Sequence, residues 1–235
     1  MFSVLIAAHN AERFIGETIN SLRFQTLASW ECLMIVNGSV DGTLKMAHEA
    51  ASTDERFRVI EMPFANKSAA LNEGLLQSRN DWISILDADD FWHHEKLRSQ
   101  EQFILANPEI DVLGTQLTYV DERSERKNRA PYLPTLHDDI AKKLNGRENV
   151  IANSSAVYRK SLHKRLGYYD TEVFVEDYDW WLRCLRGGAK FANLGSTDLY
   201  HRLHASSNFN TSKKQHVMKS VVDQLHALKS GEFSR

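Results

Sequence analysis

The sequence predicts an α/β fold, with a Rossmann-like and mostly parallel central sheet flanked by helices and a smaller region beside it. Over its first half the chain alternates apolar, strand-like segments with amphipathic segments, which is the pattern of strands joined by helical crossovers. The expected strands span residues 3–8, 30–36, 57–62 and 82–87, and the first of them is a continuous apolar run. Because the carboxyl ends of parallel strands meet at one edge of a sheet, we expect a ligand site at that edge.

Helical segments separate these strands. Residues 12–25 carry apolar side chains at helical spacing, namely Phe14, Ile15, Ile19 and Leu22. Helices are also expected over residues 43–52 and 67–79, each between two strands. A helix between two parallel strands forms a right-handed crossover, so the strands are expected to belong to one sheet.

The second half of the chain is less regular. Residues 121–135 are charged, carry two of the four prolines and show no periodicity, so we expect a mobile loop there. A strand over residues 152–159 and a helix over 174–188, which ends at a glycine pair, are expected to follow. Short strands are expected over residues 189–195 and 197–204.

Composition argues against several classes of protein. The 29 basic and 31 acidic residues nearly balance, and the absence of a basic block argues against binding of nucleic acid. No apolar run reaches the roughly 18–20 residues that span a bilayer. Cys32 and Cys184 lie in apolar patterns and are expected to be reduced core residues. Because the first strand follows without an export signal, we expect a cytoplasmic protein.

An acidic cluster ends the fourth apolar strand. The carboxylates of Asp87, Asp89 and Asp90 follow the buried run over residues 82–87. Charge at the end of a hydrophobic strand is unfavourable unless a cation or hydrogen-bond donors meet it. An Asp-x-Asp pair suits Mg²⁺ or Mn²⁺ bound together with a phosphate. The alternative is that Asp89 and Asp90 cap a helix over residues 94–106, and both interpretations remain open from this motif alone.

Two further polar clusters follow strands at the same expected edge. One is Ala8-His9-Asn10, and the other is Asn37-Gly38-Ser39 together with Asp41. The second cluster could present backbone N–H groups and short polar side chains to a nucleotide. It could equally be an ordinary strand-to-helix turn in which Asp41 or Thr43 is the N-cap.

A second acidic centre begins the helix expected over residues 174–188. Glu176, Asp177 and Asp179 lie in its first turn, where the helix dipole favours charged carboxylates that can act as bases. Helix capping is again the alternative interpretation. Trp180 and Trp181 follow the helical stripe and are expected in the core.

Two histidines, His201 and His204, follow the last short strand. A single histidine is usually structural, but a histidine near a carboxylate-bound cation is a plausible metal ligand. His204 is the stronger candidate of the two.

Six strings, taken in order, resemble bacterial family 2 glycosyltransferases with the GT-A fold. The resemblance runs from Ser3 to about Ser207 and includes the Asp-x-Asp strand, an acidic Glu-Asp motif and a closing Tyr-Arg-x-His-x-x-Ser segment. The strings are SVLIAAHNAERFIGETINSLRFQT, IVNGSVDGT, KSAALNEGL, ISILDADDFWHHEKL, SSAVYRKSLHKRLGYYD with VEDYDWWLR, and LYHRLHASS. Each string is moderately specific, and their order makes the resemblance highly specific.

The resemblance implies an inverting, metal-dependent transfer of a sugar from a nucleotide-diphosphate sugar, typically a UDP-sugar, to a hydroxyl of a glycan or lipid-linked acceptor. It implies Mn²⁺ or Mg²⁺ as cofactor and a role in bacterial surface polysaccharide synthesis, such as lipopolysaccharide or capsule. Such a protein would be cytoplasmic, with possible contact at the inner membrane face and possible homo-oligomers. We expect a GT-A domain over residues 1–207, in which a nucleotide-binding half (1–120) precedes an acceptor half (121–207), and a helical tail over 208–235.

Roles for individual residues also follow from the resemblance. The donor-binding residues it implies are Ala7, Asn10, Asn37 and Asp41 around the nucleoside, Lys67 at the phosphates, and Asp87 at the ribose or donor sugar. The metal ligands it implies are Asp89 or Asp90 together with His204. Asp177 is the implied general base, and Glu176 and Trp180 are the implied acceptor-side residues.

The chain departs from the family pattern at the nucleoside pocket. The Asp that usually contacts the base is Val36 here, and the opening Pro and Tyr are Ala7 and His9. Valine cannot accept a hydrogen bond from a uracil N–H, so another base, or recognition by backbone groups, is possible. The metal and base motifs are intact.

Two functions other than glycosyl transfer are compatible with an α/β sheet that carries acidic residues at its edge. A nucleotidyltransferase usually carries a basic, glycine-rich loop after the first strand, whereas this chain has AHNAERFIG with a single glycine. A catalytically degenerate binding protein on the same fold is favoured slightly by Val36 and Ala7. The carboxylates at 87–90 and 176–177 favour an enzyme over the binding protein.

Overall fold

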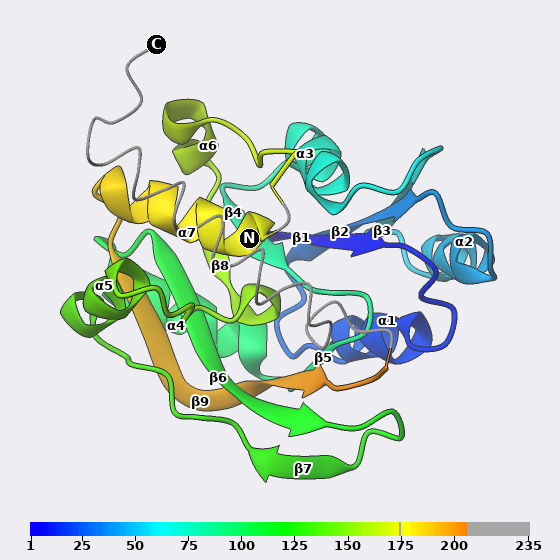
Figure 1. Ribbon diagram of the computed structural model, residues 1–235. Helices are drawn as coiled ribbons and strands as arrows, with labels where there is room; N and C mark the ends of the chain where they lie inside the picture. Colours follow the sequence, from blue (N-terminus) through cyan, green and yellow to red (C-terminus); the bar gives the residue numbers. More distant parts are fainter. Residues whose placement is uncertain (174, 206–235) are drawn as a thin grey trace.

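The computed structural model describes residues 1–173 and 175–205, and in this part of the chain nine strands form one curled sheet flanked by helices (Figure 1). The strand order is β3-β2-β1-β4-β8-β6-β9-β5, and β7 pairs with β6 outside this path. In chain order the strands are β1 (Phe2–Ala8), β2 (Trp30–Asn37), β3 (Phe57–Met62), β4 (Trp82–Ile85), β5 (Phe91–Trp92), β6 (Val112–Val120), β7 (Arg126–Arg129), β8 (Val157–Arg159) and β9 (Phe191–Arg202). This architecture confirms the predicted α/β fold class.

The four parallel strands form the half of the sheet that the apolar runs predicted. β1 pairs with β2 and with β4, and β2 pairs with β3, all in parallel. Every residue of β2 is buried, and Ala7 alone in β1 is partly exposed. A parallel strand with both faces covered has no solvent side, which is why these runs are continuously apolar instead of alternating.

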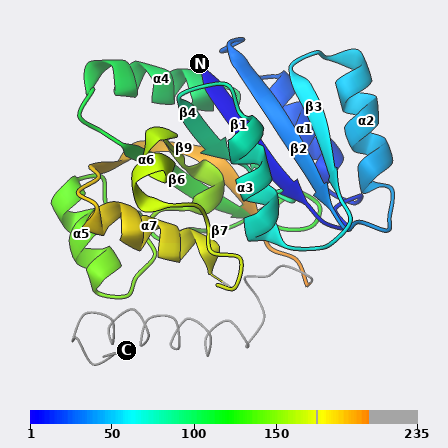
Figure 2. The ribbon, with the colours of Figure 1, turned by 90° about the horizontal axis from the view of Figure 1, so that it is seen from above.

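Helices cover both faces of this sheet and create two cores. They are α1 (Ile15–Arg23), α2 (Thr43–Thr53), α3 (Lys67–Gln77), α4 (Lys96–Ala106), α5 (His137–Asn145), α6 (Ser161–Leu166) and α7 (Glu176–Arg186). Helices α1, α2 and α4 pack with Val4 and Ile6 on one face, and α3, α5, α6 and α7 pack with Leu5 and Leu33 on the other. Successive strand residues point to opposite faces, so one strand feeds both cores. Figures 1 and 2 show α3 and α1 on opposite sides of β1.

In the second half of the chain, β7 and β9 differ from the sequence prediction. The two short strands expected over 189–195 and 197–204 are one strand, β9, which runs parallel to β6. Their separation was wrong because exposed residues at 195–197 interrupt the apolar pattern where the register with β6 shifts. Residues 126–129, expected within a mobile loop, form β7, which pairs antiparallel with β6. This edge strand consists of charged and polar residues and therefore has no apolar alternation to detect.

The structure also decides between the alternatives for the acidic cluster. Helix α4 begins at Lys96 and its N-cap is Glu95, so Asp89 and Asp90 do not cap it. The capping interpretation of these two carboxylates is wrong, and their charge requires another explanation.

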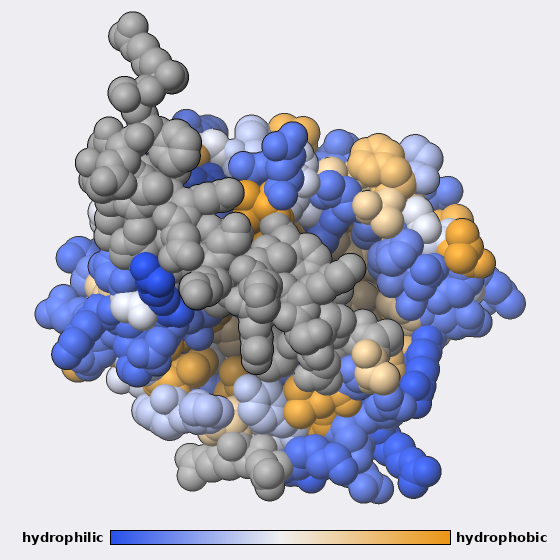
Figure 3. All heavy atoms as spheres, in the orientation of Figure 1, coloured by the Kyte–Doolittle hydropathy of each residue, from blue (hydrophilic) through white to orange (hydrophobic). Residues whose placement is uncertain are grey.

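The remaining features of the fold are the surface of the protein and its C-terminal tail. On the face drawn in Figure 3, most residues outside the grey atoms are hydrophilic, and apolar residues are scattered among them. Single exposed apolar residues of this kind are normal for a folded protein. Among residues 1–173 and 175–205, no helix is long and apolar enough to cross a bilayer. The helical tail expected over 208–235 lies outside the described residues, and the expected division near residue 120 remains a prediction.

Candidate active site

The loops that follow β1 and β2 are joined by a ladder of side-chain hydrogen bonds. Asn10, whose φ of 47° lies in the left-handed region, accepts a hydrogen bond from the Val40 N–H at 2.9 Å, and its own N–H donates to Ser39 Oγ at 3.1 Å. His9 Nδ1 donates to the carbonyl of Asn37 at 2.8 Å. The expected donor-binding residues of these two loops are therefore brought together at the carboxyl edge of the sheet.

Asn37, which stands where the family pattern has an Asp, is buried and bonded on both ends of its amide. Its Nδ2 donates to the carbonyl of Ala8 at 3.0 Å, and its Oδ1 accepts from the N–H of Asn66 at 3.2 Å. Asn37 therefore fastens the end of β1 and the start of α3 to the end of β2. Val36 beside it is buried and carries no polar group.

Asp41 holds the start of α2. Its carboxylate accepts hydrogen bonds from the N–H of Thr43 at 3.0 Å, from Thr43 Oγ1 at 2.5 Å and from the N–H of Glu12 at 3.1 Å. Burial of Asp41 raises its pKa, but the hydrogen bonds outweigh that effect and leave the pKa below its usual value. Asp41 thus joins the loop after β1 to the helix after β2.

Lys67, the first residue of α3, lies between carboxylates from two distant parts of the chain. Its Nζ is 2.7 Å from Asp87 Oδ1, after β4, and 3.0 Å from Glu176 Oε1, at the start of α7. Burial lowers the pKa of Lys67, but the two carboxylates outweigh burial and hold the pKa well above its usual value. Burial raises the pKa of Asp87; Lys67 opposes this, and the charges of Asp90 and Asp89 add to it. The expected donor side and acceptor side therefore meet at one ammonium group.

Asp89 and His204 form a close pair across the same edge. The Nε2 atom of His204 is 2.8 Å from Oδ2 of Asp89, although 115 residues separate them in the chain. The His204 side chain is 7% exposed and that of Asp89 is 31% exposed. Burial raises the pKa of Asp89, but the hydrogen bond and charge of His204 outweigh it, and the pKa lies below its usual value. Asp89 is thus ionised and accessible near neutral pH.

Asp90, the other carboxylate expected to bind metal, is placed differently. Its side chain is fully buried, and its two oxygens accept hydrogen bonds from the N–H of Arg202 at 2.9 Å and from His201 Nδ1 at 3.1 Å. Burial lowers the pKa of His201, but Asp90 outweighs burial and raises that pKa to about 9. Asp90 therefore forms an internal ion pair with His201.

The acidic start of α7 lies on the other side of Lys67. Asp177 Oδ2 accepts a hydrogen bond from Asn149 Nδ2 at 2.9 Å. Helix α7 has Val175 as its N-cap and no side-chain capping bond, so capping does not account for Glu176 and Asp177. Trp180 was expected both in the core and beside the acceptor; it is fully buried and stacks on His163 with ring centroids 4.0 Å apart. The core position of Trp180 is confirmed, and its acceptor-side role remains a prediction.

The residues present fit a divalent cation held jointly with a ligand. In the described part of the chain, no three His, Cys, Asp or Glu side chains form a ready-made metal cage. Asp89 offers a hard oxygen and His204 an imidazole nitrogen, a mixed pair that suits Mn²⁺ and, less well, Mg²⁺. Two protein ligands leave positions for phosphate oxygens and water, as is usual for these ions at nucleotides.

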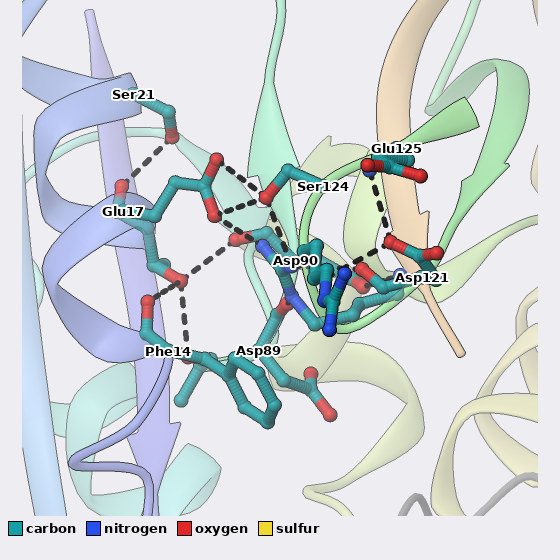
Figure 4. A network of polar contacts seen from close by, with 12 residues as sticks. Phe14, Glu17, Ser21, Asp89, Asp90, Asp121, Ser124 and Glu125 are labelled. Carbon is teal, nitrogen blue, oxygen red and sulfur yellow. Dashed lines mark hydrogen bonds and ion pairs between the residues drawn. The ribbon is translucent and has the colours of Figure 1, made fainter. Parts of the chain in front are cut away.

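Sequence reasoning missed a group of residues behind Asp89. Arg202 is buried in the closing segment and donates to the backbone carbonyl of Asp89 at 2.8 Å, and Glu17 and Ser124 contact its guanidinium (Figure 4). Ser154 Oγ accepts a hydrogen bond from the N–H of Asp87 at 3.0 Å. Arg202 is the arginine of the closing Tyr-Arg-x-His-x-x-Ser segment, and its place in that motif, two residues before His204, was the available signal.

Solved structures that resemble this one are glycosyltransferases of the GT-A fold class. The S. aureus TarS 1–349 complex with UDP-GlcNAc superposes with a TM-score of 0.76 at 19% identity and covers 94% of this chain. The mannosyltransferase PcManGT from Pyrobaculum calidifontis, in complex with GDP-Man and Mn²⁺, gives a TM-score of 0.69 at 16% identity over 100% of this chain. In both cases this chain spans 65% of the other chain, less than two thirds. At these identities the likeness establishes the fold.

Sequence comparisons identify the family. Residues 3–167 match the model of glycosyl transferase family 2, so the chain belongs to that family. The amylovoran biosynthesis glycosyltransferase AmsE of Erwinia amylovora is 29% identical, covering 97% of this chain and 85% of its own length. The O-antigen biosynthesis glycosyltransferase WbnJ of Escherichia coli is 27% identical, covering 88% and 81%.

Proposed function

We propose that this chain transfers a sugar from a nucleotide-diphosphate sugar to a hydroxyl of a glycan or lipid-linked acceptor, with inversion at the anomeric carbon. The observation that carries the proposal is the Asp89–His204 pair, 2.8 Å apart at the carboxyl edge of the sheet. Asp87 and Asp177 lie at the same edge, linked through Lys67 and Glu176. A mixed metal-binding pair and a separate carboxylate base are what such a transfer requires.

Donor binding is assigned to the loops after β1, β2 and β4. Ala7, Asn10, Asn37 and Asp41 border the nucleoside, and Asp87 faces the ribose or the donor sugar. A UDP-sugar is the first donor to test, because TarS was solved with UDP-GlcNAc, and a GDP-sugar is the second, because PcManGT was solved with GDP-Man. Since Val36 offers no side-chain acceptor, backbone groups of these loops are proposed to recognise the base.

Mn²⁺ or Mg²⁺ is assigned to Asp89 and His204. When bound, such an ion neutralises the charge that develops on the departing nucleoside diphosphate. Asp89 is preferred to Asp90 because its side chain is 31% exposed, whereas that of Asp90 is buried between His201 and Arg202. Lys67, which was expected at the donor phosphates, is proposed to hold Asp87 and Glu176 in place instead, since both lie within 3.0 Å of its ammonium.

Asp177 is the proposed general base. Its carboxylate removes the proton of the acceptor hydroxyl while the hydroxyl oxygen forms a bond to the anomeric carbon and the bond from that carbon to the phosphate oxygen breaks. Asn149 holds one oxygen of Asp177 at 2.9 Å, which orients the carboxylate. With one base and direct displacement, no second carboxylate is needed as nucleophile, and the configuration inverts.

A biological role is suggested by relatives named for amylovoran and O-antigen biosynthesis. We propose assembly of a bacterial surface polysaccharide at the cytoplasmic face of the inner membrane.

Thermal unfolding with nucleotide sugars tests the proposal. The protein is heated with UDP-, GDP- and dTDP-sugars, each with Mn²⁺ and with a chelator. A ligand at one hundred times its Kd stabilises the folded state by about 2.7 kcal/mol, so one donor should raise the Tm only when Mn²⁺ is present. Asp89→Asn should abolish the shift, and Asp81→Asn, an exposed carboxylate at the other end of β4, should retain it. Stabilisation by no donor, or by a donor equally well in chelator, would contradict the proposal.

A further inference from the structure

Arg202, the last residue of β9, is 1% exposed, and all three nitrogens of its guanidinium donate hydrogen bonds within the protein. Its Nε donates to the backbone carbonyl of Asp89 at 2.8 Å. One Nη donates to the carbonyl of Asp121 and to Ser124 Oγ, both at 3.0 Å, and the other pairs with the carboxylate of Glu17. The guanidinium thus contacts the loop after β4, the turn after β6, and α1. Figure 4 labels the residues of these three segments, Asp89, Asp121, Ser124 and Glu17.

The backbone of the same residue contacts the next position in the acidic cluster. The N–H of Arg202 donates to Asp90 Oδ1 at 2.9 Å, while its side chain binds the carbonyl of Asp89. On either side of it, His201 bonds Asp90 and His204 bonds Asp89. Four hydrogen bonds from residues 201–204 therefore meet two adjacent aspartates, and they fix the peptide between Asp89 and Asp90 from both sides.

Aromatic rings hold the guanidinium in its plane. The Arg202 guanidinium carbon lies 4.8 Å from the centroid of Phe14 and 5.3 Å from that of Phe91. The Phe14 ring also contacts the imidazole of His204, with centroids 4.8 Å apart. Arg202 and His204 are thus packed on one ring, so a shift of the first would disturb the second.

We propose that Arg202 is a positioning residue that holds the Asp89–Asp90 peptide so that the Asp89 carboxylate faces His204. This role rests on the function proposed above, in which Asp89 and His204 hold the metal ion. Arginine offers five N–H donors in a rigid fork, and here four different oxygen atoms accept hydrogen bonds from its nitrogens. Lysine has a comparable charge but cannot reach these acceptors from one planar group. Glu17 and Ser124 anchor Arg202 from outside the site.

Nuclear magnetic resonance of histidine-labelled protein without metal provides the first test. The ring nitrogens of His204 are assigned with His204→Gln, and Asp89→Asn defines the spectrum without the carboxylate. In Arg202→Lys and in Glu17→Gln, the His204 resonances should move toward their position in Asp89→Asn. Glu17 is 43% exposed on its side chain, so Glu17→Gln keeps the proposal testable where Arg202→Lys fails to fold. Arg56→Lys, which also removes a guanidinium stacked on an aromatic ring and paired with Asp54, is the control and should leave His204 unmoved.

Titration with Mn²⁺ in the presence of the nucleotide sugar provides the second test. Residues that orient a metal ligand typically change metal affinity by 10–100-fold, so both variants should weaken Mn²⁺ binding about tenfold and Arg56→Lys should not. Unmoved His204 resonances in folded Arg202→Lys and Glu17→Gln would overturn the proposal. A wild-type protein that binds neither Mn²⁺ nor nucleotide would instead overturn the proposed function, while the metal-free spectra would still decide the role of Arg202.

Discussion

Removing the ammonium of Lys67 should destabilise the protein in a way that depends on pH. In Lys67→Met the carboxylates of Asp87 and Glu176 lose the cation that lies 2.7 and 3.0 Å from them. Their side chains are 23% and 12% exposed, so water replaces the lost partner only in part.

The magnitude follows from this burial. Breaking a fully buried ion pair costs about 3–5 kcal/mol, and screening at the lysine, which is 34% exposed, reduces the expected loss to about 2 kcal/mol. Lys45→Met is the matched control, because Lys45 is 81% exposed and its Nζ is 3.9 Å from Glu49. Such a surface pair contributes no more than about 0.5 kcal/mol.

The pH dependence distinguishes lost charge from lost packing. Burial already holds the pKa of Asp87 above its usual value, and loss of Lys67 should raise it further. Between the unfolded pKa and this higher folded pKa, the folded state binds more protons than the unfolded state, so stability falls as pH rises. The destabilisation of Lys67→Met should therefore be largest near neutral pH and should shrink as acid protonates Asp87. Urea unfolding of both variants and the wild type across this range is the assay. If Lys67→Met lost the same free energy of unfolding at every pH, or no more than Lys45→Met loses, the ion pairs of Lys67 would not be the cause of the destabilisation.

Three further predictions concern the base, a buried histidine and a close packing contact. Asp177→Asn should retain donor-dependent thermal stabilisation yet lose about 10²–10⁴-fold in transfer rate, and equal loss of both would remove the base assignment. Burial lowers the pKa of His163 to about 4 in the folded protein, so below about pH 6.5 the unfolded state binds one proton more than the folded state. The free energy of unfolding should therefore fall by up to roughly 3 kcal/mol toward pH 4. His163→Gln should lose this pH dependence in thermal unfolding. Gly114→Ala should lower the free energy of unfolding in urea by about 1–3 kcal/mol, because the new Cβ would lie 2.1 Å from Asn193 Oδ1. The same substitution should cost less when it is made in an Asn193→Ala variant, where this oxygen is absent.

The sequence predicted the parallel half of the fold because β1, β2 and β4 are largely buried on both faces, whereas β3 at the edge of the sheet is only partly covered. The run over residues 30–36 matches β2 to within one residue, and the run over 57–62 coincides with β3. The other half of the sheet, which mixes parallel and antiparallel pairs, has no such signal. β7 is short and charged, and helix α5 was not expected at all, because only Ile140 and Leu144 within it face the core.

The site was partly predictable for a similar reason. The topology alone places the loops after β1, β2 and β4 at one edge, and in the structure Asn10, Asn37 and Asp41 join the first two of these loops there. Pairing of Asp89 with His204 depends on where β9 ends, which the sequence did not determine, since β9 was expected as two strands. Lys67 and Arg202 each have one partner more than 100 residues away, Glu176 and Asp89 respectively, and neither of these pairings leaves a local pattern.

Asp89 and His204 are proposed to hold the divalent ion together at the donor diphosphate. Anomalous diffraction from a crystal grown with Mn²⁺ and the nucleotide sugar that stabilises the protein measures this directly. We expect a manganese peak about 2.1 Å from a carboxylate oxygen of Asp89, with His204 Nε2 and phosphate oxygens completing the coordination. A manganese peak bound by other side chains, with Asp89 and His204 still hydrogen-bonded to each other, would contradict it.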